Sequence, residues 1–142
     1  MPQGGKLTGD GTAVDLIGQE LLEEVAELYA KQMLAETPEN NGRKLVVQVF
    51  QDRDGTFVKL LAQRLTRLDS RAIALLGATS GQPSLVFAQS TEHAFDMGAL
   101  MKEAVAKLGG RGGGSKDMAQ GGVPQGQALE PVLAEVKLKL SA

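Results

Sequence analysis

The sequence predicts a small α/β domain, in which a mixed β-sheet carries packed helices and an amphipathic helix precedes the sheet. Its 142 residues suit a single domain. From residue 44 onward, short β-branched apolar runs alternate with segments of helical periodicity. Of the 18 glycines, four lie in residues 1–11 and eight in residues 109–126, so the middle of the chain keeps a strong hydrophobic pattern.

The composition narrows the chemistry that the chain can perform. The absence of cysteine excludes a disulfide framework and any cysteine-based zinc site. His93 is the one histidine, so a histidine metal cluster is excluded and a Ser-His-Asp triad would have to use it. The sequence has no apolar run of 18 residues. We expect a cytoplasmic protein with no membrane partner, no cofactor and no metal, and we assign no catalytic residues.

The N-terminal part predicts a lead followed by a long helix. Residues 1–12 are glycine-rich and polar, and we expect them to be disordered. A helix is expected over 13–36, with Thr12 at its start and Pro38 beyond its end. Its predicted apolar face comprises Val14, Ile17, Leu21, Leu22, Val25, Leu28, Tyr29 and Met33. This helix either lies on its own domain or forms an arm that docks on another domain or another copy.

Residues 43–142 predict the domain itself, in the order strand, helix, strand, strand, helix, helix. The expected strands are 44–50, 72–78 and 84–89, and the expected helices are 57–68, 96–108 and 127–140. The first two strands should be parallel through a right-handed crossover. The third should pair antiparallel with the second through a tight turn at 79–82. Helices should cover at least one face of the sheet.

Charge is distributed unevenly along the chain. Residues 13–36 carry six acids and one base, whereas residues 43–71 carry seven bases and three acids. A basic face can therefore exist in a chain of net charge −2. From charge alone, Lys59, Arg64 and Arg67 on the outer face of helix 57–68 are candidates for contact with a nucleic-acid backbone. Their alternative interpretation is ordinary solvated helix surface.

The glycine-rich segment Gly109–Gly122, GGRGGGSKDMAQGG, does not fit two familiar phosphate motifs. Gly109 and Gly114 have the spacing of a P-loop, but Ser115 and Lys116 follow in the wrong order. The dinucleotide spacing G-x-G-x-x-G also fails, because its last position falls on a non-glycine residue from either possible start.

The same segment nevertheless predicts an anion-binding loop. Consecutive glycines allow positive φ angles and close approach of a ligand to main-chain N–H groups. Arg111 and Lys116 bracket the glycines and could donate to phosphates, while Gln120 offers an amide to a sugar or base edge. The alternatives are a tight crossing of a strand or helix against the loop, or a linker.

The segment resembles the signature of the DHH-associated domain. It is most similar to the version found in alanyl-tRNA synthetases and long-form AlaX editing proteins, and the similarity extends over about residues 44–140. Ser115 stands where related DHH phosphoesterases carry histidine. The DHH catalytic motif and the zinc ligands of the editing domain are absent.

The resemblance implies a non-catalytic module that binds tRNA, in particular tRNA-Ala, and assists proofreading in a synthetase or editing protein. The implied RNA contacts are Gly110, Arg111, Gly112, Gly113, Gly114, Ser115, Lys116, Gln120 and Gly121. The absence of an editing domain predicts a fragment or a stand-alone relative. An oligomerisation or scaffold domain, with a homodimer through residues 13–36, is the alternative. A substrate-binding module of a DHH-family phosphoesterase, or an enzyme acting alone, is less favoured.

Overall fold

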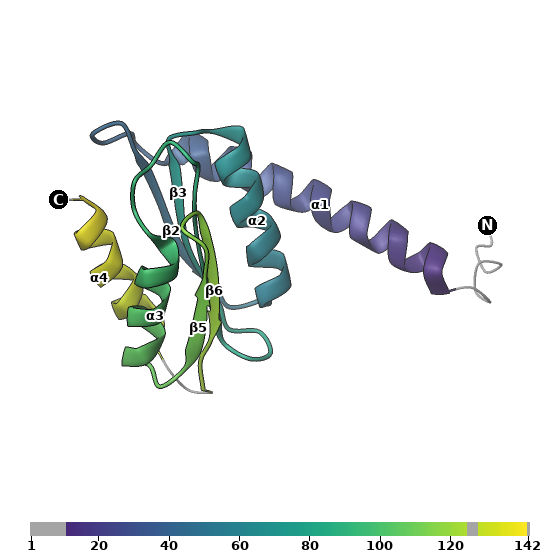
Figure 1. Cartoon of the computed structure of the whole chain (residues 1–142). Helices are drawn as coiled ribbons and strands as arrows, with labels where there is room; N and C mark the ends of the chain where they lie inside the picture. The colour runs from purple at the N-terminus through teal and green to yellow at the C-terminus, as the bar shows by residue number, and fades with distance from the viewer. Residues whose placement is uncertain (1–10, 125–127, 142) are drawn as a thin grey trace.

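The strands that the structure describes form one mixed sheet of five, with the order β2-β3-β4-β6-β5 (Figure 1). The computed structural model describes residues 11–124 and 128–141. The helices are α1 (Gly11–Glu36), α2 (Gly55–Leu68), α3 (Met97–Lys107) and α4 (Glu130–Ser141). The strands are β2 (Lys44–Phe50), β3 (Ala72–Ala78), β4 (Ser84–Gln89), β5 (Arg111–Gly114) and β6 (Met118–Gly122).

The predicted strand pairings are confirmed, and two strands are added to them. β2 and β3 run parallel around α2, and β4 returns antiparallel to β3. β6 then pairs with β4, and β5 pairs with β6, both antiparallel. The mixed α/β fold class is therefore confirmed, with a larger sheet than the sequence predicted.

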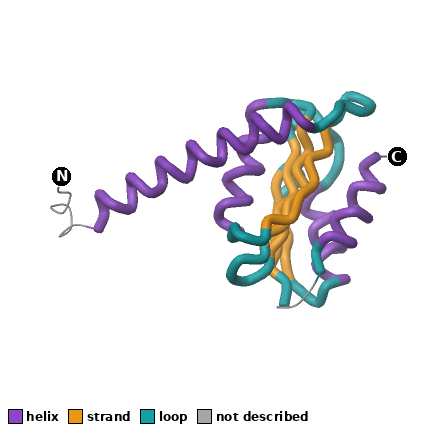
Figure 2. Tube along the Cα trace, turned by 180° about the vertical axis from the view of Figure 1, so that it is seen from behind, coloured by secondary structure: helices purple, strands orange, loops and turns teal. Residues whose placement is uncertain are grey.

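Helices lie on both sides of the sheet (Figure 2), and a hydrophobic core fills the space under them on each face. On one face, α1 and α2 pack on alternate residues of β2, β3 and β4, with Phe57 and Leu61 fully buried. On the other face, α3 and α4 pack on Leu75 and Phe87. The continuous burial of β3 explains its unbroken apolar run, because both of its faces are covered.

Helix α1 packs on the domain through part of the predicted stripe, because Leu22, Val25, Tyr29 and Met33 lie partly buried against the core, and alanines complete the contact. Ala26, Ala30 and Leu34 are buried, whereas Leu21 and Leu28 are 56% and 66% exposed. The small alanines allow the C-terminal half of α1 to lie close to α2, while the N-terminal half extends beyond the body of the domain (Figure 1). The interpretation of Leu21 and Leu28 as inward-facing residues is therefore wrong.

Some element boundaries also differ from the predictions. α1 begins at Gly11, so the predicted lead is two residues too long, and residues 1–10 lie outside the described part of the chain. The last helix begins at Glu130 rather than at residue 127. Residues 125–127 also lie outside the described part of the chain. Within the described residues, no helix is long and apolar enough to cross a bilayer.

Candidate nucleic-acid interface

The glycine-rich segment forms a β-hairpin at one edge of the sheet. β5 pairs with β6, and the turn is closed by the Ser115 N–H, which donates to the Met118 carbonyl over 2.9 Å. Of the glycines in this segment only Gly109, which precedes β5, has a positive φ, of 72°. The predicted concave loop of left-handed glycines is therefore wrong, because β5 is an extended edge strand.

Close packing against α3 explains why several of these residues are glycine. A Cβ added to Gly121 would lie 2.7 Å from Cγ1 of Val105, and one added to Gly112 would lie 3.2 Å from Cγ of Met101. On the helix side, a Cβ added to Gly98 would lie 3.2 Å from the Ser115 carbonyl oxygen. The hairpin thus makes the tight helix–strand crossing that the sequence left open as an alternative.

The two cations that bracket the glycines differ in their surroundings. Arg111 is exposed at the start of β5, and no hydrogen bond or ion pair engages its side chain within the described residues. Lys116 lies in the hairpin turn, where its Nζ donates to the His93 carbonyl over 2.8 Å and lies 3.4 Å from Oδ1 of Asp117. Lys116 is therefore held by contacts within the turn, and Arg111 is the more available of the two.

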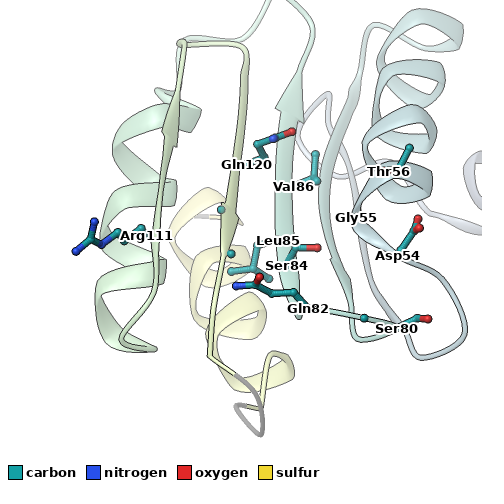
Figure 3. Close-up of a pocket in the computed structure, with 13 residues that line it drawn as sticks. Asp54, Gly55, Thr56, Ser80, Gln82, Ser84, Leu85, Val86, Arg111 and Gln120 are labelled. Atoms are coloured by element: carbon teal, nitrogen blue, oxygen red, sulfur yellow. The ribbon is translucent and has the colours of Figure 1, made fainter.

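A polar groove of about 660 Å³ lies where the helices leave the sheet uncovered, between α2 and β6. Figure 3 shows Gln120 on β6, Ser84 on β4, and Asp54 and Thr56 at the start of α2. The Ser84 Oγ is buried and has no partner there. Arg111 stands at the outer edge with its guanidinium directed away from the groove (Figure 3). The groove thus offers neutral hydrogen-bonding groups and one carboxylate, that of Asp54, while Arg111 lines its outer edge with the guanidinium directed outward.

The predicted basic face of α2 is not continuous. The Arg64 guanidinium lies 3.0 Å from Oε1 of Glu23 and 3.8 Å from Oε1 of Glu27, so α1 neutralises it. Lys59 and Arg67 are exposed on α2 and have no ion pair within the residues that the structure covers. Arg64 therefore joins α2 to α1, and two separate cations remain on this helix.

A buried amide, which the sequence analysis missed, fixes the hairpin turn. Gln89 is 3% exposed, and its Nε2 lies 2.6 Å from the Phe95 carbonyl, 3.1 Å from the Lys116 carbonyl and 3.2 Å from Oδ1 of Asp117. Its backbone N–H also donates to the Asp117 carbonyl. A polar residue that ends an apolar strand was the available signal, because burying an amide is costly unless it is hydrogen-bonded.

Helix α3 is capped by the same turn. The Met97 N–H donates to the Lys116 carbonyl over 2.8 Å, and the Gly98 N–H donates to the Ser115 carbonyl over 2.9 Å. The Asp96 side chain, at the N-cap, accepts from the Ala99 N–H over 3.1 Å. The turn therefore satisfies N–H groups that a helix start would leave without partners.

Asp69, Arg71 and Glu103 have shifted pKa values, and all three belong to ion pairs outside the groove. Hydrogen bonds from the Arg71 guanidinium lower the pKa of Asp69 to about 2, and the same contacts, together with Glu39, raise the pKa of Arg71. A hydrogen bond from Lys139 lowers the pKa of Glu103. These pairs hold the α2–β3 loop and join α3 to α4, so their role is structural.

The described residues contain no group of three or more histidine, cysteine, aspartate or glutamate side chains that could hold a metal ion. The Nε2 of His93 lies 2.9 Å from the Ser70 carbonyl oxygen. Asp54 and Asp96 accept from backbone N–H groups as helix N-caps. His93, Asp54 and Asp96 are therefore engaged in local structure.

Residues 41–142 match the family model of the DHHA1 domain. The chain belongs to the DHHA1 domain family. This DHHA1 domain is 34% identical over 110 residues to the alanine–tRNA ligase of Leptospira interrogans serovar copenhageni, a stretch that covers 75% of the chain and 11% of the ligase. It is 31% identical over 119 residues to that of Pseudomonas fluorescens, covering 82% of the chain and 14% of the ligase. The chain thus spans only about a tenth of the length of these relatives.

Solved structures show the same fold. The C-Ala domain of Aquifex aeolicus alanyl-tRNA synthetase matches with a TM-score of 0.66 and 22% identity, over 75% of this chain and 98% of that one. RecJ of Thermus thermophilus matches with a TM-score of 0.62 and 16% identity, over 87% of this chain and 18% of that one. The DHHA1 domain is therefore similar to an accessory domain of alanyl-tRNA synthetase, as the resemblance predicted.

Proposed function

We propose that the chain is a non-catalytic module that binds tRNA-Ala and assists the proofreading of mischarged tRNA in a cytoplasmic alanyl-tRNA synthetase or editing protein. The observation that supports it best is the unpaired Arg111 on a glycine edge strand, in a domain whose relatives are alanine–tRNA ligases. Sheet edges and backbone N–H groups bind anions, and glycines let a phosphate approach them closely.

The groove beside the hairpin supports the same function in a second way. The Gln120 amide and the Thr56 hydroxyl can donate and accept hydrogen bonds, which suits ribose hydroxyls and base edges. Aromatic side chains do not line this groove. The arrangement therefore favours recognition of RNA shape and backbone over stacking of unpaired bases.

Fluorescence anisotropy with a labelled tRNA-Ala transcript tests the proposal. We expect micromolar or weaker binding, with an affinity that falls steeply with salt because bound phosphates release counterions. An unrelated tRNA serves as the specificity control. Absence of binding at low salt, or an affinity that does not change with salt, would refute the proposed function.

Self-association through α1 is a second candidate function. Leu21 and Leu28 lie seven residues apart, are more than half exposed and therefore share one outer face of the helix. Acidic residues Glu20, Glu24 and Glu27 lie along this helix and would oppose close pairing of two copies. Light scattering of the wild type and of the double variant L21S/L28S tests it, and a monomer in both removes it. Deleting α1 is a poorer test, because Ala26 and Ala30 belong to the core.

A further inference from the structure

A lysine on α3 lies beside the glycine edge strand. Lys102 is exposed, and a Cβ added to Gly113 would lie 3.4 Å from its Cε and 3.9 Å from its Cγ. The aliphatic part of Lys102 therefore runs over β5 in space that a side chain at Gly113 would contact. The contact brings a cation from a helix to a strand that itself carries no other side chain than that of Arg111.

Lys102 differs from its neighbours on α3 in having no acidic partner. Lys107 pairs with Glu135, and Glu103 pairs with Lys139, so the helix surface facing α4 is neutralised. Within residues 11–124 and 128–141, no carboxylate pairs with Lys102 or with Arg111. The positive charge of this edge is therefore uncompensated.

Lys102 and Arg111 lie beside the same short stretch of the sheet edge. Gly113, which Lys102 covers, lies two residues along β5 from Arg111, or about 7 Å at the usual rise of an extended strand. β5 is the last strand of the sheet, so its outer side presents backbone N–H groups without a neighbouring strand. Lys116 lies farther along, in the turn, with its ammonium already bonded to the His93 carbonyl.

Resting on the proposed RNA-binding function, we propose that Lys102 is an RNA-contact residue, which together with Arg111 clamps the phosphate backbone of tRNA along the outer edge of β5. The bare glycine strand forms the floor of this clamp, and the two side chains supply its charges. Compared with the sequence-based set of contacts, the clamp adds Lys102 and assigns Lys116 to the structure of the turn.

The salt dependence of binding gives the expected size of the effect. Each phosphate contact contributes a slope of about 0.7–0.9 to the fall of log affinity with log salt, and this contribution vanishes near 1 M salt. Loss of one contact should therefore weaken binding about tenfold at 50 mM salt and about threefold at 200 mM. Replacement of a lysine away from the clamp by alanine should change neither the affinity nor the slope.

The experiment compares Lys102→Ala, Arg111→Ala and Lys137→Ala with the wild type. Binding of labelled tRNA-Ala is measured by fluorescence anisotropy at four salt concentrations between about 50 and 400 mM, a range over which counterion release changes the affinity. Lys137 is the matched control, because it is an exposed lysine of α4, a helix that packs on β2 and β3, toward the edge of the sheet opposite β5. Lys102→Arg keeps the charge and should restore binding. The melting temperature of each variant confirms that it folds.

We expect both Lys102→Ala and Arg111→Ala to lower affinity and slope, with Lys137→Ala unchanged. If Arg111→Ala weakens binding while Lys102→Ala matches Lys137→Ala, the proposed role of Lys102 is wrong and the RNA-binding function stands. If all three variants weaken binding equally, the clamp is wrong, because only overall charge matters. A wild type that does not bind tRNA overturns the clamp and the proposed function together.

Discussion

Two neighbouring glycines of β5 should differ markedly in how far the same substitution changes the stability of the domain. A Cβ at Gly114 would come within 2.6 Å of the Cα of Ala119, which belongs to the backbone of β6 and cannot move alone. A Cβ at Gly113 would come no closer than 3.4 Å to the flexible end of Lys102. The chemical change is identical, so the difference isolates the packing of the hairpin.

The expected magnitudes follow from these distances. Overpacking a well-packed site costs about 1–3 kcal/mol, so Gly114→Ala should lower the free energy of unfolding by at least that amount. Gly113→Ala reduces the conformational freedom of the unfolded chain, which stabilises a protein where the native φ suits alanine. The free energy of unfolding should therefore change by between a loss of about 0.5 kcal/mol and a gain of about 1 kcal/mol. Gly113 is not among the residues of positive φ, which meets that condition.

Urea denaturation followed by circular dichroism measures both free energies, with the slope of the transition as a check that the native state keeps its compactness. Each variant is compared with the wild type and with the other in the same buffer. Equal stability of Gly113→Ala and Gly114→Ala would refute the packing explanation, and the glycines would then have to be explained by ligand binding or by backbone freedom.

Three further outcomes are expected. Because the pKa of Asp69 is lowered to about 2 in the folded protein from an ordinary value of 3.8, its stabilisation is fully present above about pH 4 and is lost as the pH falls through 2. Asp69→Asn should therefore flatten the acid limb of a stability–pH curve, by on the order of 1–2 kcal/mol after solvent screening; an unchanged limb contradicts this. Asp96→Ala removes an N-cap and should cost about 1 kcal/mol in chemical denaturation, whereas Asp96→Asn, as the control, should cost less. Arg64→Ala breaks the contacts to Glu23 and Glu27 and should leave tRNA affinity unchanged; a marked loss of binding would return Arg64 to the interface.

The central strands and the helices around them could be predicted from the sequence because their patterns have strong physical causes. β3 is apolar throughout since both of its faces are covered, and the turn at residues 79–82 contains Gly81 with a φ of 75°. The hairpin could not be predicted in this way. A strand of sequence RGGG has neither β-propensity nor alternation, so pairing with β6 and packing of α3 determine its conformation.

The candidate site was predicted in part. Arg111 and Gln120 lie where a ligand can reach them, and the glycine segment is the structural centre of that region. Lys102 was missed because a lysine on the outer face of a helix is normally solvated surface, and only the fold brings it over Gly113. The inner face of α1 was predicted only in part for a related reason, since Ala26 and Ala30 are buried where Leu21 and Leu28 were expected to be.

The capping of α3 by the hairpin turn has a consequence for how the domain opens. Because carbonyls of Ser115 and Lys116 accept from the first N–H groups of α3, the helix start and the turn cannot separate without exposing both. Gln89 ties the same turn to the end of β4. These amides should therefore exchange with solvent as one cooperative unit, and rare openings of the domain should release the hairpin and the first turn of α3 together.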